Sequence, residues 1–296
     1  MTDFHFDKVP SIDEIDSVDL MNLSYEGRKP MDFILPGFLA GTVGSVIGAG
    51  GGSKSLLSQI ISFNVGGVKS VDLDIGDIPV GRSVFISCED PKIVTEDRAL
   101  AIKEYCTQEE WEMVARNVDI KCFSEYSIDI MDDRWFKLFV EMLEGTRLAI
   151  IDTLSLIHSY DENVNTDMKK IISRFRQICE ITGSGILFIH HANKGTVLSG
   201  NADSQQAARG ASSITDNVRF QLNVFMPSND DRDFKKVAGT LKNRDCVALL
   251  ASKVNYGEKY GTFYYERISS DHPNNKGGYI LKKLQKGASS EQKKYD

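Results

Sequence analysis

The chain of 296 residues lacks any apolar run of 18 residues, so no segment is suited to cross a membrane as a helix. Its acidic first residues are followed by no hydrophobic signal core, and we therefore expect a cytoplasmic protein with no membrane partner. The five cysteines are scattered and form no C-x-x-C pair, which argues against a zinc site or a disulfide framework. We expect them to be small buried hydrophobic residues.

Positive charge is also scarce, because 35 Lys and Arg face 42 Asp and Glu and give a net charge of −7. A protein that coats DNA with its outer surface is usually basic, so any DNA contact has to come from a local basic lining. Internal repeats and a linker between two domains are absent as well. We expect an N-terminal arm at 1–30, one ATPase domain at 31–285 and a disordered tail at 286–296.

Strand and helix patterns alternate through the first two thirds of the chain. Buried strands are expected at 43–47, 83–88, 118–123, 148–151 and 185–189. Helices are expected near 11–20, after residue 55, and at 92–105, 108–116, 133–144 and 167–182. Further β-like runs follow near 215–226, 233–242, 247–254, 260–267 and 277–284. This order predicts an α/β fold, a mostly parallel sheet flanked by helices and extended by C-terminal antiparallel strands.

The stretch 43–55, V-G-S-V-I-G-A-G-G-G-S-K-S, has the strand, glycine-rich turn and helix of a phosphate-binding loop. Its glycines let backbone N–H groups point inward, and the helix N-terminus adds positive potential. We expect Lys54, on a solvent-facing loop, to contact the phosphates of ATP, and the Ser55 hydroxyl to bind Mg²⁺. The residues expected around the nucleotide are Gly48, Ala49, Gly50, Gly51, Gly52, Ser53, Lys54, Ser55 and Leu56. The alternative is a glycine-rich loop that binds nothing.

One position departs from the phosphate-loop pattern. Ser53 stands where the second glycine of G-x-x-x-x-G-K-[ST] belongs. If this position has a positive φ, serine costs about 1 kcal/mol there. Relaxation of the turn by the preceding glycines makes that cost tolerable.

Other strand ends carry carboxylates, and ligands of parallel α/β sheets lie at the carboxyl ends of strands. Four apolar residues lead to Asp152, a Walker B pattern whose acid would hold Mg²⁺ through a water. Thr153 follows, so the residue that activates water has to come from elsewhere, and Glu89 is the candidate. The alternatives are a strand-ending Asp that caps a turn and an exposed carboxylate at residue 89.

Two adjacent histidines end the strand expected at 185–189. In a strand His190 and His191 point to opposite faces, so one can sense the γ-phosphate while the other packs or faces solvent. Either could be a satisfied structural histidine. Lys194, just beyond, could contact DNA or a neighbour's nucleotide.

Taken together, these motifs resemble the RepA-type hexameric replicative helicases of broad-host-range plasmids, in the RecA/DnaB superfamily of P-loop NTPases. The similar runs lie in order at 31–36 (M-D-F-I-L-P), 40–55, 88–91 (C-E-D-P), 151–154 (I-D-T-L), 190–195 (H-H-A-N-K-G), 205–213 (Q-Q-A-A-R-G-A-S-S), 216–219 (D-N-V-R) and 252–257 (S-K-V-N-Y-G).

The resemblance implies a ring of six subunits, with ATP and Mg²⁺ bound between neighbours. It assigns the second histidine, His191, as the sensor, and Arg219 as the arginine that reaches into the neighbour's site. It also implies a pore lined by residues 195–209, with Lys194 and Arg209 near the backbone of single-stranded DNA.

The sequence therefore predicts an ATP-dependent replicative DNA helicase that hydrolyses Mg-ATP at subunit interfaces and moves along single-stranded DNA. Two alternatives remain. One is a RecA-class ATPase that remodels or loads protein–DNA complexes without unwinding. The other is a nucleotide-binding regulatory protein that hydrolyses ATP poorly because of Ser53.

Overall fold

The computed structural model describes residues 9, 11–162, 164–191, 212–275 and 277–285. Contacts divide the chain into two units, Met1–Met31 and Asp32–Asp296. Every described residue of the first unit is exposed, and its regular structure is one 3₁₀ turn, η1 (Ile12–Glu14). The longer helix expected near 11–20 is therefore wrong, because a short helix needs packing that this segment does not have. Among the described residues, no helix is long and apolar enough to cross a membrane.

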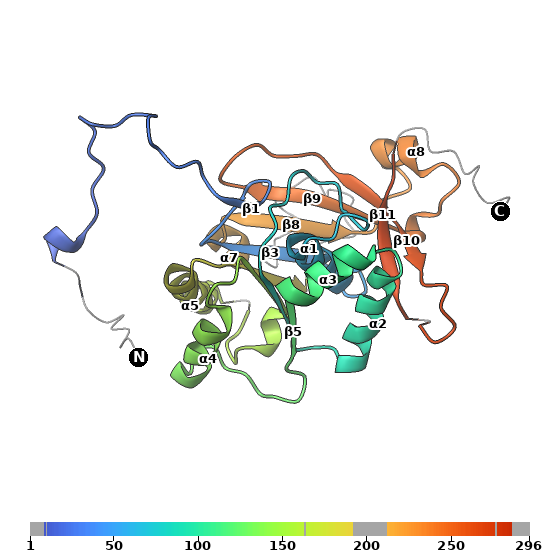
Figure 1. Ribbon diagram of the computed structural model, residues 1–296, viewed down its shortest axis with the longest axis horizontal. Coiled ribbons are helices and arrows are strands. Elements are labelled where there is room, and N and C mark those ends of the chain that lie inside the picture. The colour runs from blue at the N-terminus through green and yellow to red at the C-terminus, as the bar shows by residue number, and fades with distance from the viewer. Residues whose placement is uncertain (1–8, 10, 163, 192–211, 276, 286–296) are drawn as a thin grey trace. The chain divides into compact units, whose positions relative to one another are not determined.

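The second unit is built on a sheet whose described strands follow the order β11-β10-β9-β8-β3-β7-β6-β4-β5 (Figure 1). The strands are β3 (Val43–Gly48), β4 (Ser83–Ser87), β5 (Val118–Cys122), β6 (Leu148–Asp152), β7 (Gly185–His191), β8 (Phe220–Phe225), β9 (Cys246–Val254), β10 (Phe263–Ser269) and β11 (Tyr279–Lys283). Neighbours from β8 through β3 to β5 pair in parallel. From β8 to β11 the pairing is antiparallel. The predicted fold class is confirmed.

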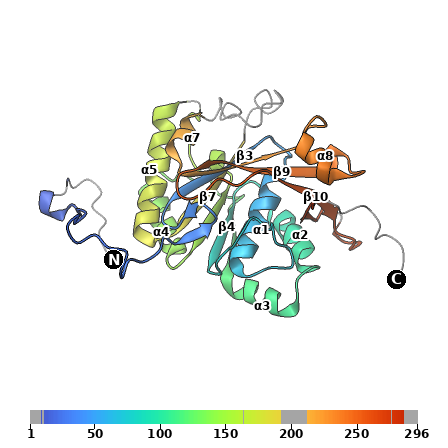
Figure 2. The same ribbon diagram turned by 90° about the horizontal axis from the view of Figure 1, so that it is seen from above.

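Helices cover both faces of the sheet (Figure 2). One face carries α1 (Lys54–Gly66), α2 (Lys92–Lys103) and α3 (Gln108–Asn117), and the other carries α4 (Asp133–Leu143) and α5 (Asn165–Thr182). Strand β6 shows why its sequence is uniformly apolar. Leu148 and Ile150 pack into the first core, whereas Ala149 and Ile151 pack into the second. A parallel strand buried on both faces has no polar side to present.

Shorter elements complete the unit, and one of them corrects the sequence analysis. They are β1 (Phe33–Leu35), β2 (Phe38–Leu39), η2 (Leu154–Leu156), α7 (Ser212–Asn217), α8 (Arg232–Ala238) and η4 (Asn243–Asp245). The run 233–242, expected to be β-like, contains α8, because the Asp231 carboxylate accepts hydrogen bonds from the first N–H groups of the helix. Phe234 and Ala238, one helical turn apart, bury against Tyr264. The run 215–226 likewise begins in α7, and its strand starts only at Phe220.

Glu110 joins α3 to the chain that follows α1, and we expect its loss to destabilise the fold. Its carboxylate accepts hydrogen bonds from the N–H groups of Lys69, Ser70 and Thr107, each at 2.9 Å, and from the Ser70 hydroxyl at 2.5 Å. Glu110→Ala should lower the free energy of unfolding at neutral pH by about 1–3 kcal/mol, the range for hydrogen bonds to a charged group. Urea denaturation measures this, and Glu109→Ala in the same helical turn is the control.

The same carboxylate predicts a pH dependence. Partial burial raises its pKa, but the hydrogen bonds from Ser70, Thr107 and Lys69 prevail and lower the pKa of Glu110 from 4.5 to about 2. A carboxyl group whose folded pKa is depressed stabilises the fold above its unfolded pKa, and this stability is lost as pH falls from 4.5 towards 2. The difference between wild type and Glu110→Ala should shrink across that interval. A difference that stays constant down to pH 2 would contradict the assignment.

Candidate nucleotide-binding site

Adjacent strands of the parallel part of the sheet bring the predicted site residues to one edge. In the order β3-β7-β6-β4, the carboxyl ends lead to Lys54, His191, Asp152 and Glu89. The register pairs Gly48 with His191 and Ser87 with Asp152, so these strands end at the same level. The Cys88 and Glu89 N–H groups both lie against the Asp152 carbonyl oxygen, at 2.6 and 3.3 Å, which holds the ends of β4 and β6 together.

The glycine-rich loop follows β3 and has the backbone shape that its sequence suggests. A Cβ added to Gly48 would lie 2.2 Å from the carbonyl oxygen of Val224 on β8, so only glycine fits there. Gly51 has φ +74°, and Ser53 is also left-handed, with φ 67°. The positive φ considered for Ser53 is therefore present. Its side chain makes no capping hydrogen bond within the described residues, so the helix N-terminus is not closed by its own serine.

Lys54 is the first residue of α1 and is only 4% exposed, so the expected solvent-facing position is wrong. Its ammonium group folds back, donates to the Ala49 carbonyl oxygen at 2.8 Å and lies 3.1 Å from Nδ1 of His191. The other ring nitrogen of His191 lies 3.3 Å from a carboxylate oxygen of Glu89. Burial lowers the pKa of Lys54, against the opposing charges of Asp152 and Glu89. One histidine thus connects the loop lysine with the strand-end glutamate.

Asp152 is fully buried, and its chemistry fits a bound cation. Neither of its carboxylate oxygens has a hydrogen-bond partner of ordinary geometry within the described residues. Burial raises the pKa of Asp152 to about 6, although the nearby Ser55 hydroxyl and Arg98 favour the charged form. A buried carboxylate with unused oxygens beside a hydroxyl is a suitable oxygen donor set for Mg²⁺. No cluster of three or more His, Cys, Asp or Glu suited to a metal occurs among the described residues, as expected if phosphates supply the remaining ligands.

A family model described as an AAA domain, AAA_25, matches residues 14–197, which is more than half of the chain. The chain belongs to this AAA domain family. Among solved structures, one described as an isolated ATPase domain has a TM-score of 0.49 and 13% identity over 81% of this chain and 84% of that one. A DnaB-like replicative helicase, solved in a study of its interactions with primase, has a TM-score of 0.52 and 12% identity.

The match to the DnaB-like helicase covers 81% of this AAA domain protein and 57% of that chain, so this chain spans little more than half of the helicase's length. At 12% identity the likeness shows the fold, which is RecA-like. Family and fold together make the chain a P-loop ATPase of the RecA/DnaB type.

His190 takes part in a different arrangement, which the sequence did not reveal. Its Nδ1 lies 3.6 Å from one carboxylate oxygen of Glu162, and Nε2 of His158 lies 3.7 Å from the same oxygen. The Tyr160 N–H donates to Nδ1 of His158, which leaves the proton of the neutral ring on Nε2, facing Glu162. His190 is 5% exposed. The two histidines therefore differ, because His191 faces Lys54 and Glu89 whereas His190 is held by a buried carboxylate.

Arg219 is not brought to this edge. Its N–H donates to the carbonyl oxygen of Val43 at the start of β3, whereas the loop begins after Gly48 at the other end of that strand. At about 3.3 Å per residue, the two ends of β3 are roughly 16 Å apart. Arg176 and Lys253 carry like charges close enough to Arg219 to form a basic cluster that lowers the pKa of Lys253, after the larger effect of burial. Lys253 belongs to the run 252–257, a signal that sequence inspection could have used.

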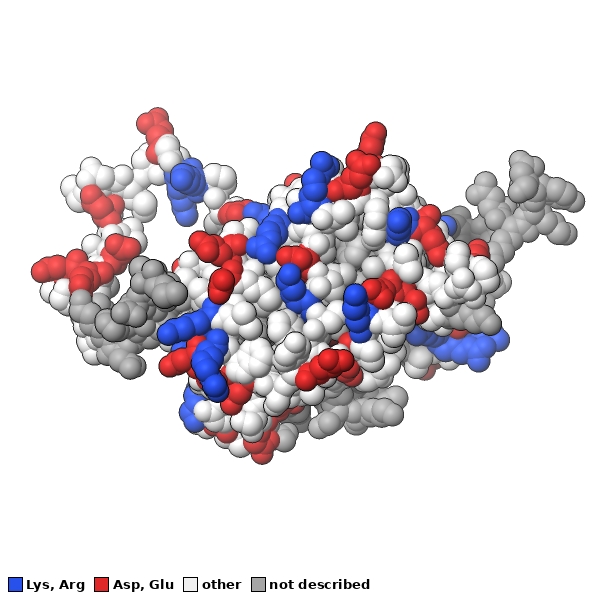
Figure 3. All heavy atoms as spheres, turned by 60° about the horizontal axis from the view of Figure 1, so that its bottom comes forward, with Lys and Arg blue, Asp and Glu red and all other residues white. Residues whose placement is uncertain are grey.

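Lys194 and Arg209 lie outside the described residues, together with most of the stretch expected to line a pore. On the face drawn in Figure 3, Lys and Arg alternate with Asp and Glu, with no extended surface of one sign. That face offers no broad basic surface for DNA.

The left-handed Ser53 gives a testable prediction. Ser53→Gly should retain or raise nucleotide affinity, because it relieves about 1 kcal/mol of backbone strain while glycine costs about 0.5–1 kcal/mol in the unfolded chain. Titration with ATP measures the affinity, and Ser53→Ala, which keeps the strain but removes the hydroxyl, is the matched control. If both variants bind ATP much more weakly, the serine hydroxyl itself contacts the phosphates.

Proposed function

We propose that this P-loop ATPase is a replicative DNA helicase of the RepA type, which hydrolyses Mg-ATP between the subunits of a hexameric ring. The observation that carries the proposal is the link from Lys54 through His191 to Glu89 at one edge of the sheet, with Arg219 at the opposite edge. In such a ring, hydrolysis in one interface after another drives the movement along single-stranded DNA.

Each residue at the edge has a role that its environment supports. Lys54 leaves its contact with Ala49 and binds the β- and γ-phosphates, while the loop N–H groups bind the phosphate oxygens. Glu89, half-exposed at the end of β4, accepts the proton of the attacking water. His191 contacts both groups, so it registers whether the γ-phosphate is present. Ser55 and Asp152 would hold Mg²⁺, which neutralises charge on the phosphates when bound.

The position of Arg219 supports a site completed by two chains. An arginine side chain is much shorter than the roughly 16 Å that separates the ends of β3, so Arg219 does not serve the phosphate loop of its own chain. Placed against the phosphate loop of a neighbour, its guanidinium would stabilise the charge that develops as the γ-phosphate leaves. Hydrolysis then requires assembly.

DNA binding is assigned to the centre of the ring, through Lys194 and Arg209. The acidic net charge and the mixed charges in Figure 3 support a confined path rather than the outer surface. The DnaB-like protein that shares this fold is, by its title, a replicative helicase.

ATP-dependent separation of a forked DNA duplex tests this function. The helicase should release the labelled strand with ATP and Mg²⁺, and not with a non-hydrolysable analogue. ATP hydrolysis stimulated by DNA without strand separation would favour a remodelling or loading ATPase. Nucleotide binding without turnover would favour the regulatory protein.

A further inference from the structure

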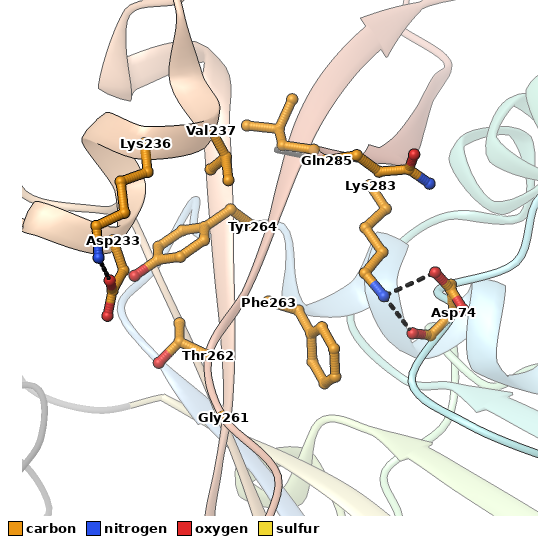
Figure 4. A pocket seen from close by; sticks show the side chains of 11 residues that line it. Asp74, Asp233, Lys236, Val237, Gly261, Thr262, Phe263, Tyr264, Lys283 and Gln285 are labelled. Carbon is orange, nitrogen blue, oxygen red and sulfur yellow. Dashed lines mark hydrogen bonds and ion pairs between the residues drawn. The ribbon is translucent and has the colours of Figure 1, made fainter. Parts of the chain in front are cut away.

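We propose that the pocket at the ends of β10 and β11 holds the base of the nucleotide and sets the preference for a purine nucleoside triphosphate. This inference rests on the proposed ATPase. The pocket measures about 610 Å³ and lies between the loop at Asp74, the helix α8 and the two strand ends (Figure 4).

The order of the strands gives the direction in which the nucleotide lies. The groups proposed to act on the γ-phosphate follow β7, β6 and β4, all on one side of β3. The γ-phosphate therefore points to that side. The remainder of an extended nucleotide runs the opposite way, across β8 and β9 towards β10 and β11.

The register of the sheet gives the distance. Gly48 at the start of the loop lies against Val224 of β8, Val224 pairs with Leu249 of β9, and Leu249 pairs with Phe263 of β10. Three strand spacings of about 4.8 Å place Phe263 roughly 14 Å from Gly48 along the same edge. This distance matches the span of an extended nucleoside triphosphate from its phosphates to its base.

The lining of the pocket suits a flat, uncharged ring with a polar edge. Figure 4 shows Tyr264 turned towards Asp233, while Phe263 is turned towards the side of Lys283. The Lys283 ammonium lies 4.4 Å from the centroid of the Phe263 ring and 2.7 Å from the Asp74 carboxylate, which keeps that aromatic wall in place. Aromatic faces stack on nucleobases without requiring a particular sequence of atoms.

The charged groups of the pocket are already neutralised, so it does not resemble a phosphate site. Lys283 pairs with Asp74, and Lys236 pairs with Asp233 at 2.7 Å. Thr262 and Gln285 instead offer polar side chains that make no hydrogen bond within the described part of the chain. A glutamine amide presents one donor and one acceptor side by side, the pattern that pairs with the edge of adenine.

The test compares ATP with inorganic tripolyphosphate, which has the phosphates but no base. Phe263→Leu keeps an apolar side chain in the partly buried position, and Gln285→Ala changes an exposed residue, so both variants should fold. We expect each to weaken Mg-ATP binding by about 10-fold, measured by calorimetry on the full chain. Binding of Mg-tripolyphosphate should be unchanged, and the preference for ATP over a pyrimidine triphosphate should diminish.

Tyr279→Ala, on β11 but outside the pocket, is the control and should alter neither ligand. Unchanged ATP affinity in both variants would overturn the inference. Equal weakening of ATP and tripolyphosphate would overturn it too, because the damage would then lie at the phosphates. If the wild-type chain binds neither ligand, the proposed ATPase itself fails and the inference falls with it.

Discussion

Arg219→Ala is expected to lower the rate of ATP hydrolysis by about 10³-fold or more while ATP still binds, the range for loss of an arginine that acts in trans. Binding is retained because Lys54 and Ser55 belong to the other edge of the sheet. Steady-state hydrolysis and equilibrium nucleotide binding, measured on the same preparation, separate the two effects. Arg116→Ala, on α3 and away from this edge, is the control and should keep its activity.

Mixed rings make the prediction about Arg219 sharper. Lys54→Ala should also be inactive, because it removes the phosphate contact within the phosphate loop. When the two inactive variants are mixed, some interfaces combine an intact loop with an intact Arg219, and part of the activity should return. Full activity of Arg219→Ala alone would exclude the trans role. Mixed rings that demonstrably form but remain inactive would show that Arg219 acts elsewhere or that the subunits must act in strict sequence.

Glu89→Gln is expected to slow hydrolysis by about 10²–10⁴-fold, because the amide keeps the size of the side chain and cannot accept the proton of water. ATP affinity should stay near that of the wild type, since the Lys54 and Ser55 groups remain. Single-turnover hydrolysis and direct binding measure the two quantities, with Glu96→Gln on α2 as a charge-matched control. Weaker ATP binding combined with a normal rate would make Glu89 a structural residue.

The sequence predicted the parts of this fold that depend on local pattern. Each central strand is an apolar run that ends in one polar residue, so Asp152, Glu89 and the histidine pair could be placed at strand ends. Parallel pairing then placed those ends on one edge. The positive φ of Ser53 followed from its place in the motif.

Features that depend on contacts between distant segments could not be predicted in this way. Lys54 is buried because His191, 137 residues later in the chain, closes over it. Helix α8 forms where the run looked β-like, because Asp231 caps it and Tyr264 from another strand covers it. The pairing of His190 with Glu162 likewise joins segments that are separate in the sequence.

In the proposed ring, each nucleotide site is completed by a neighbouring chain. The most direct test is the specific rate of ATP hydrolysis, with single-stranded DNA, as a function of protein concentration, with the mass in solution recorded alongside. We predict a rate per chain that is low for the monomer, rises as the ring assembles and then stays constant. A rate per chain that is already maximal when the protein is monomeric would contradict shared sites.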